Sequence, residues 1–376
     1  MHIHALCFIT LPLIPLEVFS DLVEERKVDL ATMTTMKAAM YDEIGGPEKL
    51  YIAEVERPEP GTGEVLIKVH AAAINRVDSL QLAGQFQPAP GVSSILGLDV
   101  AGEVVKLGPG CSKWNSSLPS GDHVMALLSG GGYGQYVAAH EGHLMPVPSH
   151  MTMTDAAGIP EAWLTAFQLL HVVGHVTKGD RVLIHAGGSG VGTALIQLVR
   201  LAEAEAIVTA GTAAKLDKAR DLGAVAGFNY KEVDFAEKVL DYTQNKGVDL
   251  ILDCVGSSFW EKNLRALAID GTWVVYGLMG GSHIEGAILL DLLRKRASLI
   301  TTTLRQRSLQ YKTDLVQAFS QTALPRFDDK LLKVVTDRVF PMEEVAEALR
   351  YNADNKNIGK IILQLMKANG SGHSEL

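Results

Sequence analysis

The stretch from Arg181 to Ala202, RVLIHAGGSGVGTALIQLVRLA, constrains the fold of this chain more than any other. An apolar run leads into a glycine-rich turn, and the residues after the turn have the apolar spacing of a helix. This arrangement is typical of a dinucleotide site, because a pyrophosphate must approach main-chain N–H groups at a helix N-terminus without meeting Cβ atoms. Ser189 stands at the middle position of G-x-G-x-x-G, where its hydroxyl can bond a phosphate oxygen. Taken alone, the motif also fits a simple tight connection between strand and helix.

Alternating strand and helix patterns follow this motif. We expect further strands at 206–210, 227–230, 248–255, 271–278 and 297–304, with helices at 213–222 and 235–243. Strands rich in Val, Ile and Leu that alternate with helices indicate a parallel sheet covered on both faces. Residues 159–306 are therefore predicted to form a doubly wound Rossmann domain of the α/β class.

The end of the second strand indicates which dinucleotide would bind. An enzyme for NAD usually places Asp or Glu there to bond the ribose 2′-hydroxyl, whereas this chain has Ala210 to Lys215, AGTAAK. No carboxylate repels a 2′-phosphate, Thr212 can cap the next helix, and Lys215 adds a positive charge to its first turn. These features favour NADPH. The alternative is that Thr212 only caps the helix and Lys215 is only a solvated lysine.

Composition narrows the functional class. The 376 residues suffice for two domains, and a net charge of −9 argues against nucleic-acid binding through a general positive field. No long uncharged segment has the helical pattern of a membrane span. The three cysteines lie far apart and form neither a disulfide framework nor a paired zinc motif, which suits a reducing compartment, and we expect the cytoplasm.

The two ends of the chain differ from its centre. The chain begins with an apolar run, residues 1–19, which prolines interrupt and no Lys or Arg precedes, and acidic residues follow it. This fits neither a secretory nor a mitochondrial targeting peptide, and residues 1–35 are predicted to be a disordered extension. Residues 36–158 have a β-rich pattern, with strands expected at 36–41, 50–55, 64–73, 97–107 and 121–128. From 307 onward we expect two helices and a last strand, 360–365. That strand is expected to return to the β-rich part, so that 36–158 and 307–376 form one discontinuous domain.

A family resemblance rests on several phrases in one order: MKAAMYDEIGGPEKL, GEVLIKVHAAAINRVD, ILGLDVAGEV, AWLTAFQLL, HAGGSGVGTA and NIGKIILQL. From Met36 to Leu365 the chain resembles the medium-chain dehydrogenase/reductase superfamily, and within it the zinc-free quinone oxidoreductases. Longer phrases such as IPEAWLTAFQLLH, ILDCVG and YGLMGG are most similar to a vertebrate, tumour-suppressor-inducible branch of these enzymes. The resemblance implies a GroES-like catalytic domain beside the Rossmann domain, and a homodimer.

The resemblance also bears on metal binding. Zinc alcohol dehydrogenases carry a cysteine after the long strand and a G-H-E word downstream, where this chain has Asn75 and Leu98-Asp99. The usual zinc site cannot form from these residues, and we expect no metal. A quinone does not require one, because conjugation spreads the charge left by hydride transfer, and the phenolate-like product has a pKa of about 10. A metal-free apolar site therefore suits quinones and other conjugated acceptors.

The family pattern assigns roles to individual residues. Asn75 is expected at the nicotinamide end and Thr165 on a helix that faces the cofactor. Phe86 is expected to border the acceptor where the related enzyme has tyrosine, so it can stack on a ring but cannot donate a proton. The expected cofactor-binding residues are Gly188, Ser189, Gly190 and Val191 at the pyrophosphate, Thr212, Lys215 and Tyr230 at the 2′-phosphate, Cys254, Val255, Gly256, Gly277, Leu278 and Met279 at the ribose and nicotinamide, and Asn357. Each also has an ordinary structural role as an alternative, in a turn, a helix contact or the core.

The sequence thus predicts a reductase that transfers hydride from NADPH to quinones, ortho-quinones among them, without a metal. Two alternatives remain open: a reductase of activated carbon–carbon double bonds such as alkenals, and an NADPH-binding protein with little turnover. The expected partner is a small molecule, with neither nucleic acid nor membrane. Homodimerisation is expected through 297–304, an apolar, β-branched stretch predicted to lie at a sheet edge.

Overall fold

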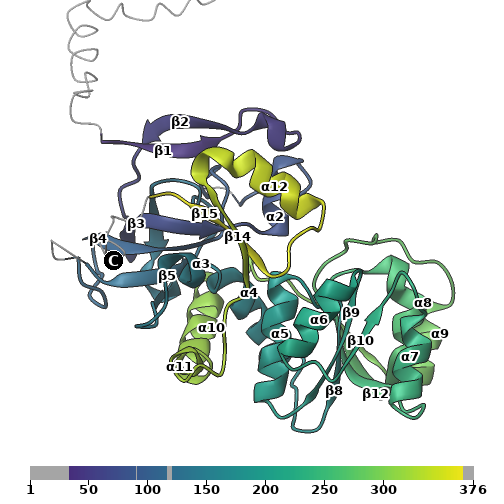
Figure 1. Ribbon diagram of the computed structural model, residues 1–376. Coiled ribbons are helices and arrows are strands. Elements are labelled where there is room, and N and C mark those ends of the chain that lie inside the picture. Colours follow the sequence, from purple (N-terminus) through teal and green to yellow (C-terminus); the bar gives the residue numbers. More distant parts are fainter. Residues whose placement is uncertain (1–33, 90, 117–120, 367–376) are drawn as a thin grey trace, which may run out of the picture. The chain divides into compact units, whose positions relative to one another are not determined.

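The computed structural model describes residues 34–89, 91–116 and 121–366 (Figure 1). The chain divides into two units, Met1–Thr35 and Met36–Leu376. The predicted disordered extension lies outside the described residues, apart from its last two positions. Everything below concerns the second unit.

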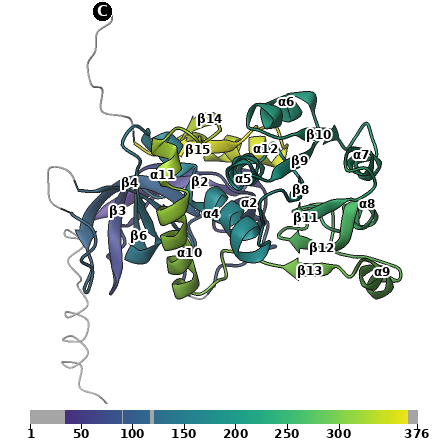
Figure 2. The same ribbon diagram turned by 90° about the horizontal axis from the view of Figure 1, so that it is seen from below.

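A six-stranded parallel sheet forms the predicted Rossmann core, in the order β10-β9-β8-β11-β12-β13. Its strands are β8 (Arg181–Ile184), β9 (Glu205–Ala210), β10 (Ala226–Asn229), β11 (Val248–Asp253), β12 (Leu267–Val275) and β13 (Ser298–Thr301). The expected position of β13 at one edge is confirmed. Figure 2 shows β13 at the end of the sheet with the helix α9 beside it.

Alternate residues of each strand enter two different cores, as a period of two requires. Val182 and Ile184 pack with residues of α4 (Pro160–Phe167), α5 (Gly190–Leu201) and α6 (Ala213–Asp221). Leu183 packs on the other face with residues of α7 (Phe235–Tyr242), α8 (Trp260–Ala266) and α9 (Ile288–Lys295). Both faces of the sheet are covered, which explains why its strands are apolar throughout.

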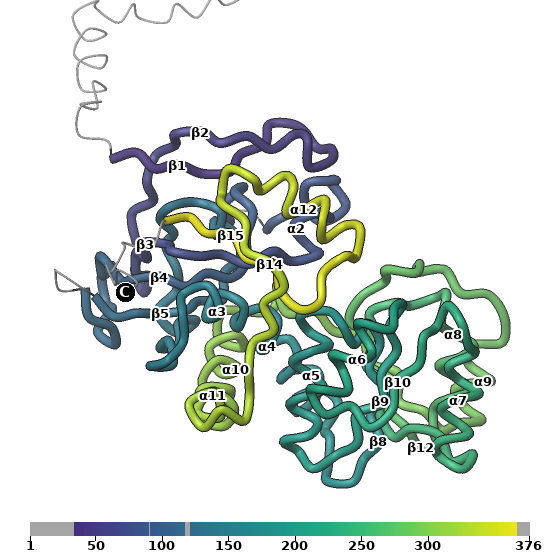
Figure 3. The backbone as a smooth tube through the Cα atoms, viewed as in Figure 1, coloured from purple at the N-terminus to yellow at the C-terminus, as the bar shows by residue number. Residues whose placement is uncertain are grey.

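A seven-stranded sheet builds the β-rich half, with six strands in one path and a seventh paired to β3. The order is β14-β15-β3-β4-β5-β7, and β6 also pairs with β3. These strands are β3 (Glu64–Ala73), β4 (Asp99–Leu107), β5 (His123–Leu127), β6 (Tyr136–His140), β7 (Leu144–Pro146), β14 (Thr336–Pro341) and β15 (Lys360–Gln364). A separate two-stranded sheet contains β1 (Thr35–Met40) and β2 (Tyr51–Glu56). The expected return of the last strand is confirmed, because β15 pairs antiparallel with β3, Ile362 opposite Ala73 (Figure 3).

Helices close the remaining surfaces of this half. They are α2 (Arg76–Leu82), α3 (Met153–Ala157), α10 (Leu309–Thr322), α11 (Pro325–Asp328) and α12 (Val345–Ala353). Short 3-10 turns occur at η1 (Pro47–Lys49), η2 (Glu141–His143), η4 (Ser257–Phe259) and η5 (Met342–Glu344), and a π-helical turn, η3 (Gln168–Val173), extends α4. No helix among the described residues is long and apolar enough to cross a membrane.

Several boundaries differ from the sequence-based expectations. The fifth Rossmann strand is 267–275 rather than 271–278, because Met279 and Gly280 donate their N–H groups to the carbonyls of Cys254 and Val255 and draw the chain into a loop. For the same reason Cys254 and Val255 follow β11 instead of ending it. The strand expected at 297–304 is confined to 298–301. After residue 307 the structure has α10, α11, β14 and α12 before β15, where two helices were expected.

Candidate active site

The glycine turn after β8 presents a helix N-terminus with a free hydroxyl hydrogen. Ser189 is the N-cap of α5, and its Oγ accepts from the N–H of Gly192 over 2.9 Å. The hydroxyl hydrogen is therefore available to a phosphate oxygen. A Cβ on Gly192 would lie 2.3 Å from the carbonyl oxygen of Ala186, so this close turn requires glycine. Gly188, Ser189, Gly190 and Val191 thus stand where a pyrophosphate would meet the helix dipole.

This turn lies directly against the start of β15. The N–H of Gly359 donates to the carbonyl of Gly188 over 2.8 Å. A Cβ on Gly190 would lie 2.6 Å from Cδ of Lys360, which shows how closely the lysine passes the first turn of α5. Lys360 therefore connects the glycine turn to the polar side chains of the β-rich half.

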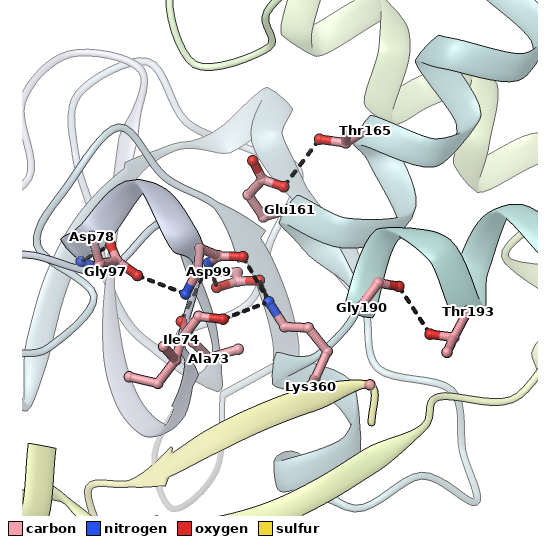
Figure 4. Close-up of polar contacts among 12 residues, drawn as sticks. Ala73, Ile74, Asp78, Gly97, Asp99, Glu161, Thr165, Gly190, Thr193 and Lys360 are labelled. Carbon is pink, nitrogen blue, oxygen red and sulfur yellow. Dashed lines mark hydrogen bonds and ion pairs between the residues drawn. The ribbon is translucent and has the colours of Figure 1, made fainter. Parts of the chain in front are cut away.

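Lys360 lies in a buried polar cluster (Figure 4). Its ammonium donates to Oδ1 of Asn75 over 2.7 Å, to Oδ2 of Asp99 over 3.2 Å and to the carbonyl of Ile74 over 3.2 Å. The amide of Asn75 in turn donates to Oδ1 of Asp99 over 2.8 Å. Every donor of the ammonium is satisfied, as a buried cation requires. The sequence singled out Asn75 for the nicotinamide end, whereas it did not reveal the pair Lys360 and Asp99.

Asp78 links this cluster to α2. Its carboxylate accepts from the N–H of Asn75 over 2.7 Å and from the hydroxyl of Tyr133 over 2.7 Å, so Asn75 and Asp78 form a capping box. Burial raises the pKa of Asp78 to about 6. Burial, together with Asp78, holds the pKa of Tyr133 well above its usual value. This arrangement fixes the side chain of Asn75 toward Lys360.

Glu161 is the acidic group best placed to exchange a proton. It lies in the first turn of α4, and Thr165 donates its hydroxyl to Oε2 of Glu161 over 3.0 Å (Figure 4). Burial, and then the nearby charge of Asp99, raise the pKa of Glu161 to about 7. Its carboxyl can therefore act as an acid near neutral pH. The structure brings the expected residue Thr165 to Glu161, whereas Glu161 itself could be noticed in the sequence only by its place in the phrase PEAWLT.

The donor set at Asn75 does not suit zinc. Where a zinc dehydrogenase needs soft or imidazole ligands, this chain has an amide and a carboxylate already bonded to a lysine ammonium. The pair His140 and His143 is engaged elsewhere: His140 Nδ1 accepts from the N–H of Gly142, and His143 Nε2 contacts the carbonyl of Leu309. Within the described ranges, no cluster of three or more His, Cys, Asp or Glu residues could hold a metal ion.

Cationic and hydroxyl groups surround the end of β9, where a 2′-phosphate would lie. Thr212 caps α6 and accepts from the N–H of Lys215 over 3.4 Å. The side chain of Lys215 passes over Gly188, and its ammonium donates to the carbonyl of Asn355 over 2.6 Å. The hydroxyl of Tyr230 and Cε of Lys231 both flank Gly211, at 2.9 and 3.1 Å from where a Cβ would stand. The sequence reading identified Tyr230 but missed Lys231.

Arg76 is another missed cation on this side. Its guanidinium donates to the side-chain oxygen of Asn355, the residue whose carbonyl accepts from Lys215. Burial lowers the pKa of Arg76, and the nearby Cys254 raises it slightly. In the sequence, only its place in the word N-R-x-D, directly after Asn75, pointed to a role for Arg76 in the site.

Two loops at the carboxyl ends of β11 and β12 hold the remaining cofactor candidates. Met279 donates its N–H to the carbonyl of Cys254 over 3.0 Å, and buried Asp253 accepts from the N–H groups of Val255 and Gly256. Gly256 has φ 84°, a conformation that favours glycine. The set Cys254, Val255, Gly256, Gly277, Leu278 and Met279 is thus brought together, with Leu278 and Met279 exposed.

Asn357 and Phe86 make their recorded contacts with residues outside the Lys360 cluster. The amide of Asn357 donates to the carbonyl of Gly359 over 2.6 Å, so it stabilises the loop that precedes Lys360. Phe86 lies in the loop after α2, and the guanidinium carbon of Arg305 is 5.1 Å from its ring centroid. A cation over an aromatic face is attracted to it.

Comparisons with known proteins agree with this geometry. The family model "Alcohol dehydrogenase GroES-like domain" matches residues 61–149, and "Zinc-binding dehydrogenase" matches 190–321. Human quinone oxidoreductase is 30% identical over 315 residues, which cover 83% of this chain and 92% of that protein. A mycobacterial structure in complex with NADPH is 30% identical, with a TM-score of 0.77, and covers 88% of this chain and 100% of its own. The CurK enoyl reductase is 26% identical, with a TM-score of 0.78 and coverages of 89% and 100%.

Proposed function

The chain belongs to the quinone oxidoreductase family of the medium-chain dehydrogenases/reductases, and on that basis we propose that it reduces quinones with NADPH and without a metal ion. The observation that carries the proposal is the contact between the cofactor turn and Lys360, which brings the helix N-terminus of α5 beside Asn75, Asp99 and Glu161. NADPH bound at this turn would supply a hydride to a conjugated acceptor.

The chain's own residues would orient the acceptor and supply the proton. Hydride addition leaves an oxyanion, and the protonated carboxyl of Glu161 can transfer its proton to that oxygen and take up another from solvent. One hydride and one proton per cycle convert the quinone into a hydroquinone. Where the hydride has added to a ring carbon, that carbon then loses a proton to water as the second oxygen gains one, so no further proton is consumed. Thr165 holds Glu161 in place, and Asn75 is held by Lys360 and Asp78. We propose that Asn75, Phe86 and Thr165, the residues expected from the sequence, form the reaction site together with Glu161.

The choice of NADPH is supported by the charge around Gly211. Lys215 and Lys231 are ammonium groups near one turn that has no carboxylate in its sequence, Ala210 to Lys215, and Thr212 and Tyr230 add hydroxyl groups. A 2′-phosphate would accept charge-assisted hydrogen bonds from them. A bound phosphate would also compete with the carbonyl of Asn355 for the ammonium of Lys215.

We further propose a homodimer formed through the open edge at β13. Leu289 and Leu293 of the neighbouring helix α9 are 82% and 72% exposed, and Leu299 of β13 is 38% exposed. Apolar side chains of this size on a free strand edge and its flanking helix favour pairing with a second copy. Two-fold pairing of β13 would join the two sheets into one. The same proposal keeps a catalytic domain formed by 36–158 and 307–376 and a Rossmann domain formed by 159–306. It also keeps a cytoplasmic location.

A second candidate function is the reduction of activated carbon–carbon double bonds. The acid Glu161 favours it, because after hydride addition to an alkenal the neighbouring carbon must receive a proton. The structural similarity to an enoyl reductase supports the same chemistry.

Steady-state kinetics with purified enzyme test both functions. We expect NADPH oxidation with an ortho-quinone at a kcat/KM well above that with an alkenal of similar size. The reverse order would favour the double-bond reductase. Tight NADPH binding without oxidation by any acceptor would instead indicate a cofactor-binding protein and contradict both proposals.

A further inference from the structure

A partly buried arginine beside Phe86 and a buried lysine lie close together, with no carboxylate ion-paired to either among the described residues. Arg305 follows β13, and Lys312, only 3% exposed, lies on α10. Both reach Ser129 after β5: the guanidinium of Arg305 donates to its carbonyl over 2.8 and 3.0 Å, and the ammonium of Lys312 donates to its hydroxyl over 3.2 Å. Within the described part of the chain, no Asp or Glu forms an ion pair with either.

The guanidinium of Arg305 also has an unused donor. Its Nη2 is satisfied by Oε1 of Gln81 at 2.7 Å and by Ser129, whereas Nη1 is buried and has no hydrogen-bond partner. An unpaired buried donor is unfavourable, and more so when the group is charged. Burial, and then repulsion from the adjacent Arg305, lowers the pKa of Lys312. A protein retains such an arrangement where a ligand supplies the missing charge.

The location of this pair connects it to the acceptor. The guanidinium lies over the ring of Phe86, and Gln81 is one helical turn beyond Asp78 on α2. Arg305 is within electrostatic range of both Asp78 and Glu161. Neither carboxylate balances the pair fully, because Asp78 is bonded to Tyr133 and Asn75, and Glu161 is bonded to Thr165. An acceptor stacked on Phe86 would therefore bring a substituent to Nη1 of Arg305.

Building on the reductase function proposed above, we propose that Arg305 and Lys312 form an anion-binding subsite of the acceptor pocket, so that the preferred acceptors are conjugated carbonyl compounds that carry a carboxylate or similar oxyanion. Arg305 would bind the oxyanion through Nη1, and Lys312 would supply its remaining donors. The apolar part of the acceptor would stack on Phe86.

A matched acceptor pair tests the subsite: ortho-naphthoquinone and its ring sulfonate, which differ by one anionic group. We expect kcat/KM for the sulfonate to exceed that for the neutral quinone, and we expect this ratio to fall about tenfold or more in Lys312→Met and Arg305→Met, the scale of a charge-assisted hydrogen bond. The control is Arg307→Met, an exposed arginine on the same loop that bonds Thr302, and it should leave the ratio unchanged. A ratio that is the same in the unmodified enzyme and in Lys312→Met would overturn the subsite.

A binding measurement separates this inference from the proposed function. Naphthalene sulfonate cannot accept a hydride, so calorimetric titration into the full-length, NADPH-loaded protein reports the subsite alone. We expect binding to the unmodified protein and at least about tenfold weaker binding to Lys312→Met, with retained NADPH affinity showing that the variant is folded. Binding of the sulfonate without reduction of any quinone would contradict only the function. Quinone reduction without sulfonate binding would contradict only the subsite.

Discussion

The ammonium of Lys360 lies 3.2 Å from Oδ2 of Asp99, and the two side chains are 5% and 0% exposed. The residues are 261 positions apart in the chain. They bring the last strand, the long strand β3 through Ile74 and Asn75, and the glycine turn of the Rossmann half to one point. The pair thereby serves both the fold and the site.

Removal of the Lys360 charge should destabilise the protein strongly. Lys360→Met leaves Asp99 buried without its cation, and we expect the free energy of unfolding to fall by about 3–5 kcal/mol. The matched control is Lys356→Met, because Lys356 pairs with Asp354 at the surface, where such pairs contribute about 0–1 kcal/mol. Urea denaturation measures both, and equal losses would contradict the role assigned to the buried pair.

The pH dependence of the reaction should follow Glu161. Its acid form predominates below its folded-state pKa of about 7, so the rate of the unmodified enzyme should fall as pH rises through 7. Glu161→Gln should be slower, with no inflection there. Thr165→Val removes a hydrogen bond that favours the charged form, so its inflection should move to higher pH. An unchanged inflection in Glu161→Gln would assign the proton to another group.

The same carboxyl should affect stability with a definite sign. The folded-state pKa of Glu161 lies above its ordinary value of 4.5, so the folded state binds more protons than the unfolded state between these values. Its contribution to stability is therefore greatest at low pH and is lost as pH rises through about 7. Thermal denaturation should show Glu161→Gln gaining stability relative to the unmodified protein between pH 5 and pH 8, the range that spans the folded-state pKa.

Cofactor preference should depend on Lys215. Lys215→Ala should weaken NADPH binding by about 1–2 kcal/mol and leave NADH nearly unaffected, because only NADPH carries the 2′-phosphate. Lys218→Ala, three residues along the same exposed helix, is the control. Fluorescence titration with both cofactors is the measurement, and equal losses for NADPH and NADH would refute phosphate recognition.

Metal removal should have no effect. Because Asn75 and Asp99 are bonded to the ammonium of Lys360, we expect full activity after exhaustive chelation and no stoichiometric zinc by elemental analysis. One tightly held zinc per chain, with activity lost on its removal, would refute the metal-free mechanism.

Dimerisation should be sensitive to the outward N–H groups of β13. Thr302 donates its N–H to Val275 on β12, so by strand alternation the N–H of Thr301 points to the open edge. Thr301→Pro should therefore disrupt pairing between copies while keeping most of the β12–β13 contact. Ile44→Ser, at an exposed residue on the other half of the chain, is the control. Light scattering that gives a single-chain mass for the unmodified protein at micromolar concentration would contradict the dimer.

The parallel sheet and the glycine turn could be predicted because they depend on local patterns. The β3 limits, Glu64–Ala73, follow from a mainly apolar run rich in Val, Ile, Leu and Ala, and α5 follows from the turn that caps it. The strand β14 carries Asp337 and Arg338 and lies at a sheet edge, so its polar sequence gave little signal. The cations Lys360, Lys231 and Arg305 could not be assigned from sequence, because their partners lie far away in the chain and a lysine or arginine is most often solvated.

Lys360 donates to Asn75 across 285 residues of chain. During synthesis from the N-terminus, the Rossmann sheet can form as soon as its own strands have emerged, whereas Asp99 must wait for a counter-ion that arrives with the final strand. Until then Ala71 to Ala73 of β3 lack the partner strand that β15 provides. A nascent or truncated chain that ends before residue 360 would thus hold a nucleotide fold without a working catalytic centre. Assembly of the proposed reaction site is therefore a late event, tied to completion of the polypeptide.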